Sequence, residues 1–124
     1  MTSFWTSFGA TLLLVALTIV QGWRGRRRAH LVLALTSVAS LTLTIVLAER
    51  MGATRTFPRD AMRIHLWFAK SAALAVVPVA LTGAVLWRRP TWRPVHRTVV
   101  VLFLLLTVAA TATGTWVFSL SEPK

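Results

Sequence analysis

Three histidines and one lysine are the residues of this 124-residue chain best placed to do chemistry in or beside its apolar stretches. His30, His65 and His96 each stand at the beginning of a long apolar run, and Lys70 lies inside one of these runs. Neutral imidazole is a standard ligand of haem iron. The chain has no cysteine, so disulfides, thiolate metal sites and haem attached through a Cys-x-x-Cys-His motif are excluded.

His30 and His96 are the candidates for the two axial ligands of a haem b, although the sequence leaves the cofactor open. Both border a strongly basic link between apolar runs. The arginines beside them are candidates for pairing with the haem propionates: Arg27, Arg28, Arg93 and Arg97. The alternative is that both histidines contact lipid headgroups, because they adjoin the charged links instead of lying a turn or more inside the membrane.

His65 and Lys70 are candidate functional polar groups without an assigned partner. A helix from position 30 to position 48 spans about 27 Å, so His65 cannot share a small site with the other two histidines. Lys70 follows His65 by five residues, which places the two side chains about 140° apart around a helix. A lysine near the end of a membrane-spanning helix can also extend its ammonium group to the interface.

Carboxylates are absent from the apolar runs, and all three acids of the chain lie outside them. A proton-coupled transporter of this size normally needs a carboxylate within the membrane. No Ser–His–Asp set, carboxylate pair, glycine-rich phosphate loop or metal-ligand cluster can be assembled from the sequence. A small transporter is therefore the weakest interpretation, and the chain is not expected to be an enzyme.

Four apolar runs organise the chain, over residues of about 4–22, 30–48, 64–87 and 98–118. As a helix, the third run spans about 36 Å, enough to cross a hydrocarbon core of about 30 Å. Fifty-six per cent of the residues are hydrophobic, more than a soluble domain this small can bury. We expect an all-α, integral membrane four-helix transmembrane bundle with up-down-up-down order, forming a single domain over residues 1–124.

Small polar residues recur within the second and fourth runs. Thr36, Ser40 and Thr44 follow one another at intervals of four residues in the second run. The fourth run repeats this spacing at Thr107, Thr111 and Thr115. Residues four apart share a helix face, and small residues allow membrane helices to approach closely. The spacing predicts that each set faces a neighbouring helix.

Basic residues occupy the links between the runs and give a net charge of +11. Each of the three links carries four arginines. Because they are spread over separate links, they suit anionic lipid headgroups and not nucleic acid. The first and third links carry eight arginines, against four arginines and Lys124 on the other side, so both termini should lie outside. The preference for arginine over lysine indicates a bacterium, and hence the bacterial cytoplasmic membrane.

Three segments carry a family-like pattern: RRRAHLVLAL (Arg26–Leu35), IHLWFAKSAALAVVPVAL (Ile64–Leu81) and RPVHRTVVVLFLLL (Arg93–Leu106). Together they resemble the CtaM/YozB-like proteins, small polytopic bacterial membrane proteins of unknown mechanism linked to maturation of haem–copper oxidases. The resemblance implies that His30, His65 and His96 match family histidines. It also implies that an outer histidine is missing, because the corresponding region reads LAER here, at residues 47–50.

The expected function is that of a small accessory or assembly protein of a respiratory membrane complex, with His30 and His96 as candidates for holding haem b. The alternative is a cofactor-free structural subunit of a larger membrane complex. In both cases the expected partners are the lipid bilayer and a larger membrane protein complex. No nucleic acid or soluble small-molecule substrate is expected.

Overall fold

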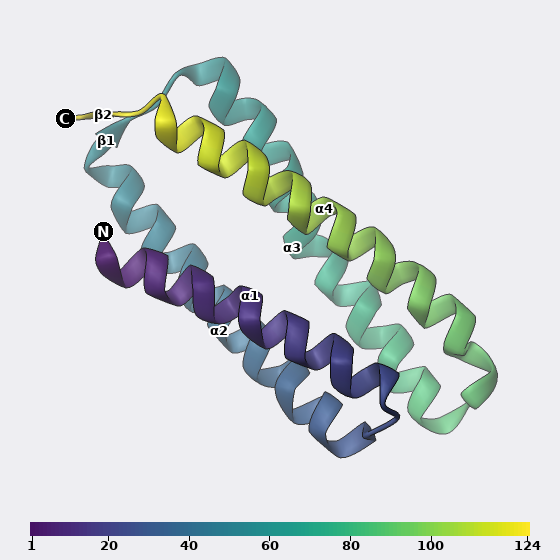
Figure 1. Cartoon of the computed structure of the whole chain (residues 1–124). Helices are drawn as coiled ribbons and strands as arrows, with labels where there is room; N and C mark the ends of the chain where they lie inside the picture. Colours follow the sequence, from purple (N-terminus) through teal and green to yellow (C-terminus); the bar gives the residue numbers. More distant parts are fainter. The chain divides into compact units, whose positions relative to one another are not determined.

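The computed structural model describes all residues from 1 to 124 and is dominated by four long helices. The elements in chain order are α1 (Thr2–Trp23), α2 (Arg27–Ala53), β1 (Arg55–Thr56), α3 (Arg59–Arg88), the 3-10 helix η1 (Pro90–Trp92), α4 (Arg93–Ser119) and β2 (Glu122–Pro123) (Figure 1). The strands β1 and β2 pair in a small two-stranded sheet. The prediction of an all-α chain with four long helices is confirmed.

The helices extend beyond the apolar runs into the charged links. α2 continues through Glu49 and Arg50 to Ala53. α3 begins directly after Pro58, and Asp60 lies in its first turn, where a negative charge favours the helix dipole. Between α1 and α2 the chain turns at Gly25, which has a positive φ of 71° that other residues rarely adopt. Hydrophobic residues form the middle of each helix, whereas α2 and α3 end and begin among charged residues.

The first of two compact units comprises residues Met1–Arg55 together with Lys124. Its helices α1 and α2 lie side by side (Figure 1). They run antiparallel, because Ser7 near the start of α1 bonds Thr44 near the end of α2, and Thr18 bonds Ser37. Both of these bonds join hydroxyl groups, so the contact between these helices is polar as well as close.

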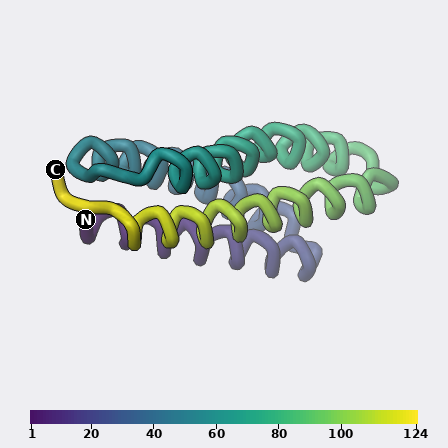
Figure 2. The backbone as a smooth tube through the Cα atoms, turned by 90° about the horizontal axis from the view of Figure 1, so that it is seen from above, coloured from purple at the N-terminus to yellow at the C-terminus, as the bar shows by residue number.

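The second unit comprises residues Thr56–Pro123. Here α3 runs into η1, and α4 returns beside α3, as the tube trace shows (Figure 2). His65 near the start of α3 contacts Thr113 near the end of α4, and Thr82 bonds His96. These pairs establish a second antiparallel hairpin. The expected single domain over residues 1–124 stays a prediction.

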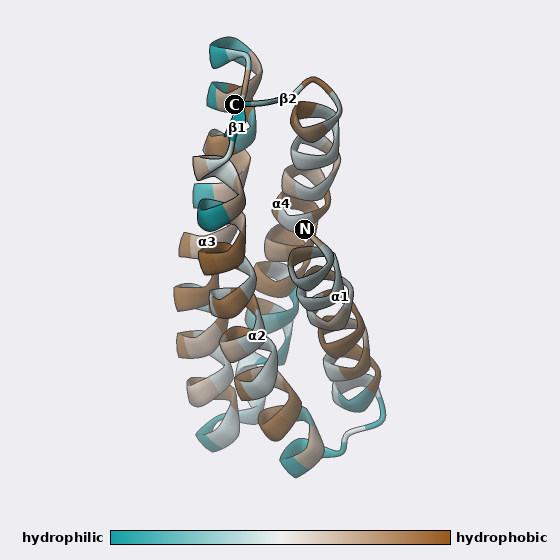
Figure 3. Cartoon of the chain, turned by 90° about the vertical axis from the view of Figure 1, so that its left-hand side faces the viewer, coloured by the Kyte–Doolittle hydropathy of each residue, from teal (hydrophilic) through white to brown (hydrophobic).

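The apolar side chains lie mainly on the outside of the helices. Only Ala61, Ala72 and Val117 are buried hydrophobic residues. Large residues such as Leu35 and Leu74 are 64% and 71% exposed. Figure 3 shows brown, apolar residues along the middle of the helices and teal, hydrophilic residues mostly towards their ends. All four helices are long and apolar enough to cross a membrane.

The predicted contact faces are confirmed at Ser40 and Thr44 of α2 and wrong at Thr36 and at Thr115 of α4. In α2 the residues that bond α1 are Ser37, Ser40 and Thr44, whereas Thr36 is exposed and bonds its own backbone at Val32. In α4 the contact to α3 includes Thr113 and Gly114, while Thr115 is exposed. A strict spacing of four drifts around a helix of 3.6 residues per turn, so a contact face alternates intervals of three and four.

Candidate functional site

Each histidine is half-buried, with its imidazole against a glycine of the neighbouring helix in the same hairpin. A Cβ atom added at these glycines would lie 3.0 Å from His30, 2.9 Å from His65 and 3.3 Å from His96. The three pairs are His30 with Gly22, His65 with Gly114, and His96 with Gly83. We call each histidine, its glycine and the oxygen that bonds its Nδ1 atom a histidine clasp.

The clasp of His30 joins α2 to α1. The Nδ1 atom of His30 lies 2.7 Å from the backbone carbonyl oxygen of Thr18, one turn before Gly22. A carbonyl oxygen can only accept a hydrogen bond, so Nδ1 must carry the proton and donate it. The missing side chain of Gly22 provides the space in which the ring lies against α1.

The clasp of His96 joins α4 to α3. The Nδ1 atom of His96 lies 2.9 Å from the hydroxyl oxygen of Thr82, the residue before Gly83. The single hydroxyl proton of Thr82 is directed to the carbonyl oxygen of Pro78, at 2.7 Å. The hydroxyl oxygen is therefore left to accept, and Nδ1 of His96 donates to it.

The clasp of His65 joins α3 to α4 with the same chemistry. Its Nδ1 atom lies 3.3 Å from the hydroxyl oxygen of Thr113, and the imidazole also bonds the backbone of Ala110. The hydroxyl of Thr113 donates to the carbonyl oxygen of Ala109, at 2.7 Å. Nδ1 of His65 is again the donor.

The carbonyl acceptor requires a proton on Nδ1 of His30, and hydroxyl groups of Thr82 and Thr113 that donate to their own helix give His96 and His65 the same Nδ1–H form. This is the arrangement by which proteins orient imidazoles that ligate metals. The donor chemistry of His30 and His96 therefore fits haem iron. His30 belongs to the first hairpin and His96 to the second, so neither hairpin holds both, and their pairing stays a prediction.

The candidate propionate partners lie in the first turns of α2 and α4, and all are exposed. Arg27 precedes His30 by three residues, and Arg93 precedes His96 by three. Residues three apart are neighbours on a helix surface. Arg28 and Arg97 stand two and one positions from their histidines, so they point to other sides of their helices. Arg27 and Arg93 are the better placed of the four candidates.

Lys70 is exposed on α3, whereas His65 is half-buried in its clasp with α4. Their separation of five residues directs them to different faces of α3. These two candidate polar groups therefore do not form a joint site.

A cluster of hydroxyl groups lies between α1 and α2, and its members on α1 were not predicted from the sequence. Thr11 Oγ1 lies 2.6 Å from the Ser40 hydroxyl and 3.0 Å from the Thr44 hydroxyl, and Ser7 lies 2.8 Å from Thr44. Thr11 and Thr44 are buried. The available signal was the interval of four residues between Ser7 and Thr11, which puts both on one face of α1.

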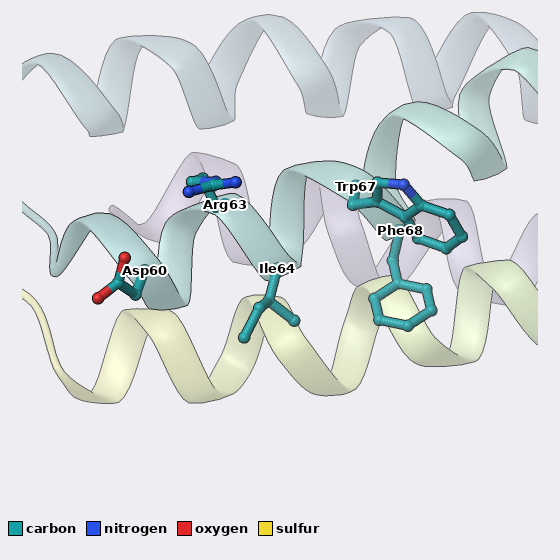
Figure 4. Close-up of a pocket in the computed structure, with 5 residues that line it drawn as sticks. All are labelled: Asp60, Arg63, Ile64, Trp67 and Phe68. Carbon is teal, nitrogen blue, oxygen red and sulfur yellow. The ribbon is translucent and has the colours of Figure 1, made fainter.

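An open depression of about 450 Å³ lies along the beginning of α3, lined by Asp60, Arg63, Ile64, Trp67 and Phe68. Its side chains leave the helix in different directions and do not converge on a point (Figure 4). None of the histidines lines it. No group of three or more histidine, cysteine, aspartate or glutamate side chains is close enough to hold a metal ion. The clasps are therefore the most defined polar sites of the chain.

Comparisons with known proteins give no match: no family model, no curated protein and no solved structure matches the chain.

Proposed function

We propose that the chain is an integral protein of the bacterial cytoplasmic membrane, crossing it four times in up-down-up-down order. The length and apolar character of all four helices support this, as does the placement of large hydrophobic side chains on their outer surfaces. Arginines gather at the turn between α1 and α2 and at the turn between α3 and α4. Under the rule that short basic loops stay in the cytoplasm, these turns face inward and both termini face outward.

Within that membrane, we propose that the chain is an accessory or assembly protein of a respiratory complex. The observation that carries this proposal is that the three histidines and some of the hydroxyl groups bond between the helices of each hairpin, while large apolar side chains remain exposed to lipid and to helices of a larger complex. The link to haem–copper oxidases comes from the resemblance of the histidine-containing segments alone.

Affinity purification tests the accessory role. A tagged chain at native expression level, extracted in mild detergent, should co-purify with terminal oxidase subunits, and deletion of its gene should lower the amount of assembled oxidase. A tagged unrelated four-span membrane protein is the control. Normal assembled oxidase in the deletion strain, together with no oxidase subunit in the purified sample, would refute the role.

Haem b binding by His30 and His96 is the second candidate, and the Nδ1–H tautomer of both residues favours it. Arg27 and Arg93 would be the first partners to test for the propionates. Bound haem would supply one-electron chemistry. A Soret band from the purified protein that disappears in His30→Ala and His96→Ala would support this candidate. A colourless protein from haem-replete cells would instead favour the cofactor-free structural subunit.

A further inference from the structure

The second hairpin contains an internal repeat that links its two clasps. His65, Thr82 and Gly83 of α3 each precede a residue of the same type in α4 by 31 positions. Their counterparts are His96, Thr113 and Gly114. In each helix the histidine is followed by Thr-Gly at the same distance, near the other end of the apolar run. The two helices therefore carry the same three polar features in the same order.

The contacts of this repeat are reciprocal. His65 of α3 bonds Thr113 and lies on Gly114 of α4, while His96 of α4 bonds Thr82 and lies on Gly83 of α3. One clasp is near each end of the hairpin. The helices are antiparallel, and the distance in sequence from the histidine to Thr-Gly is the same in both. A single alignment of α3 against α4 therefore forms both clasps.

Apolar packing alone selects this alignment weakly. Between membrane helices the surrounding lipid is as apolar as the side chains, so close packing and interhelical hydrogen bonds have to determine the contact. Both α3 and α4 are rich in alanine, valine and leucine, so a shift by one turn exchanges apolar residues for other apolar residues. A shift would, however, place each imidazole against a side chain instead of a glycine and remove its oxygen acceptor.

We propose that His65 and His96 are register clasps: a duplicated His…Thr-Gly unit that fixes the alignment of α3 and α4 through the Nδ1–H group of each imidazole. The inference concerns the hairpin itself and does not depend on haem or on any respiratory partner.

The tautomer is the first test, and it needs no substitution of the histidines under observation. Nitrogen-15 NMR of histidine-labelled protein in detergent or nanodiscs, at a pH where the rings are neutral, should show His65 and His96 protonated at Nδ1. Single His→Ala variants assign the signals. Finding His65 or His96 protonated at Nε2 would overturn the proposal.

Paired substitutions then test whether the alignment needs a donor at the position of Nδ1 or only a polar side chain at positions 65 and 96. Asparagine places an amide N–H where Nδ1 stands, whereas glutamine places it nearer to Nε2. The double variant His65→Asn/His96→Asn should retain the alignment, and His65→Gln/His96→Gln should lose it. The double variant His65→Ala/His96→Ala provides the reference without either clasp.

Engineered cysteines can report the alignment, because the chain has no cysteine of its own that would form other disulfides. Ala72 lies two helical turns after His65, and Leu106 lies two turns before Thr113, so Ala72→Cys and Leu106→Cys should form a disulfide on mild oxidation. Ala72→Cys with Ala110→Cys tests an alignment shifted by one turn.

The expected pattern is cross-linking of positions 72 and 106 in the parent and the Asn variants, with several-fold loss or transfer to position 110 in the Gln variants. Equal cross-linking in the parent, Asn, Gln and Ala variants would overturn the register role. The same variants are also examined for a Soret band and for co-purification with oxidase subunits. The Asn variants keep the clasp but lack a ligating Nε2 atom, so a failure of the register role can be distinguished from a failure of the proposed function.

Discussion

Each imidazole lies against a glycine because the Nδ1 atom can reach its acceptor on the next helix only where no side chain intervenes. The distance from a hypothetical Cβ to the ring is shortest at Gly114, where it is 2.9 Å from the Cε1 atom of His65. Real Cβ atoms essentially never come this close to another atom. At this scale the glycines are as much a part of the clasps as the histidines.

Replacing Gly114 by alanine should destabilise the second hairpin by about 1–3 kcal/mol, the usual cost of overfilling a packed contact. Gly9→Ala is the matched control, because an added Cβ at Gly9 in α1 meets nothing within 4 Å. That control should be neutral or stabilising by about 0.5–1 kcal/mol, since alanine favours a helix over glycine. Reversible unfolding in mixed micelles measures both. Equal stability changes in the two variants would contradict the close contact at His65.

Thr82→Val should remove the acceptor of His96 Nδ1 while nearly preserving the volume of the side chain. The expected loss of stability is about 0.6–1.7 kcal/mol, the range from average to strongest for hydrogen bonds between membrane helices. Thr36→Val is the control, because Thr36 is exposed and bonds only its own helix. The same unfolding measurement applies, and a loss at position 36 as large as that at position 82 would refute the role of this hydrogen bond.

Helix by helix, the chain's apolar pattern was sufficient to predict four long helices and to place their centres, because a span of some twenty apolar residues has few alternatives. The spacing of the small polar residues identified Ser40 and Thr44 on the contact face of α2 but did not identify the whole face. Thr36 was expected to face a neighbouring helix and Ser37 does so instead, since a difference of one residue rotates a side chain by about 100°. Which residues face each other depends on how two helices are aligned, and the sequence of one helix does not contain that information.

The same limit applies to the candidate site. The sequence identified His30, His65 and His96 as chemically notable, because imidazoles at the ends of apolar helices are conspicuous. It did not identify Gly22, Gly83 or Gly114 as their neighbours. The repeated His…Thr-Gly spacing in the second hairpin was visible in the sequence, but its meaning required the antiparallel pairing of α3 with α4.

The hydroxyl cluster of the first hairpin supports a further prediction for α1 and α2. Thr11→Val and Thr44→Val should each destabilise this hairpin, and a double-mutant cycle should give a coupling of about 0.6 kcal/mol or more, as found for such bonds in membrane proteins. Thr42→Val replaces Thr44→Val in the control cycle, because Thr42 is exposed and bonds Val38 of its own helix. Coupling in the control cycle as large as in the test cycle would contradict the observed pairing.

For the molecule as a whole, the decisive property is that large apolar side chains are exposed on both hairpins, while the histidines and some of the hydroxyl groups bond between the helices of each hairpin. In water such a surface would drive aggregation. In lipid it is solvated, and the internal hydrogen bonds become the contacts that distinguish one helix alignment from another. The clasps, the arginine-rich turns and the proposed accessory role all depend on lipid being the solvent of the four helices.

Cysteine labelling in spheroplasts tests that dependence most directly. Single cysteines replace Trp23 and Thr91, beside the two arginine-rich turns, and Ser3 and Thr54, at the opposite ends of the helices. A membrane-impermeant maleimide should label positions 3 and 54 from outside, and positions 23 and 91 only after the membrane is opened. Labelling of all four positions from outside, or of positions 23 and 91 from opposite sides, would contradict the four-span arrangement.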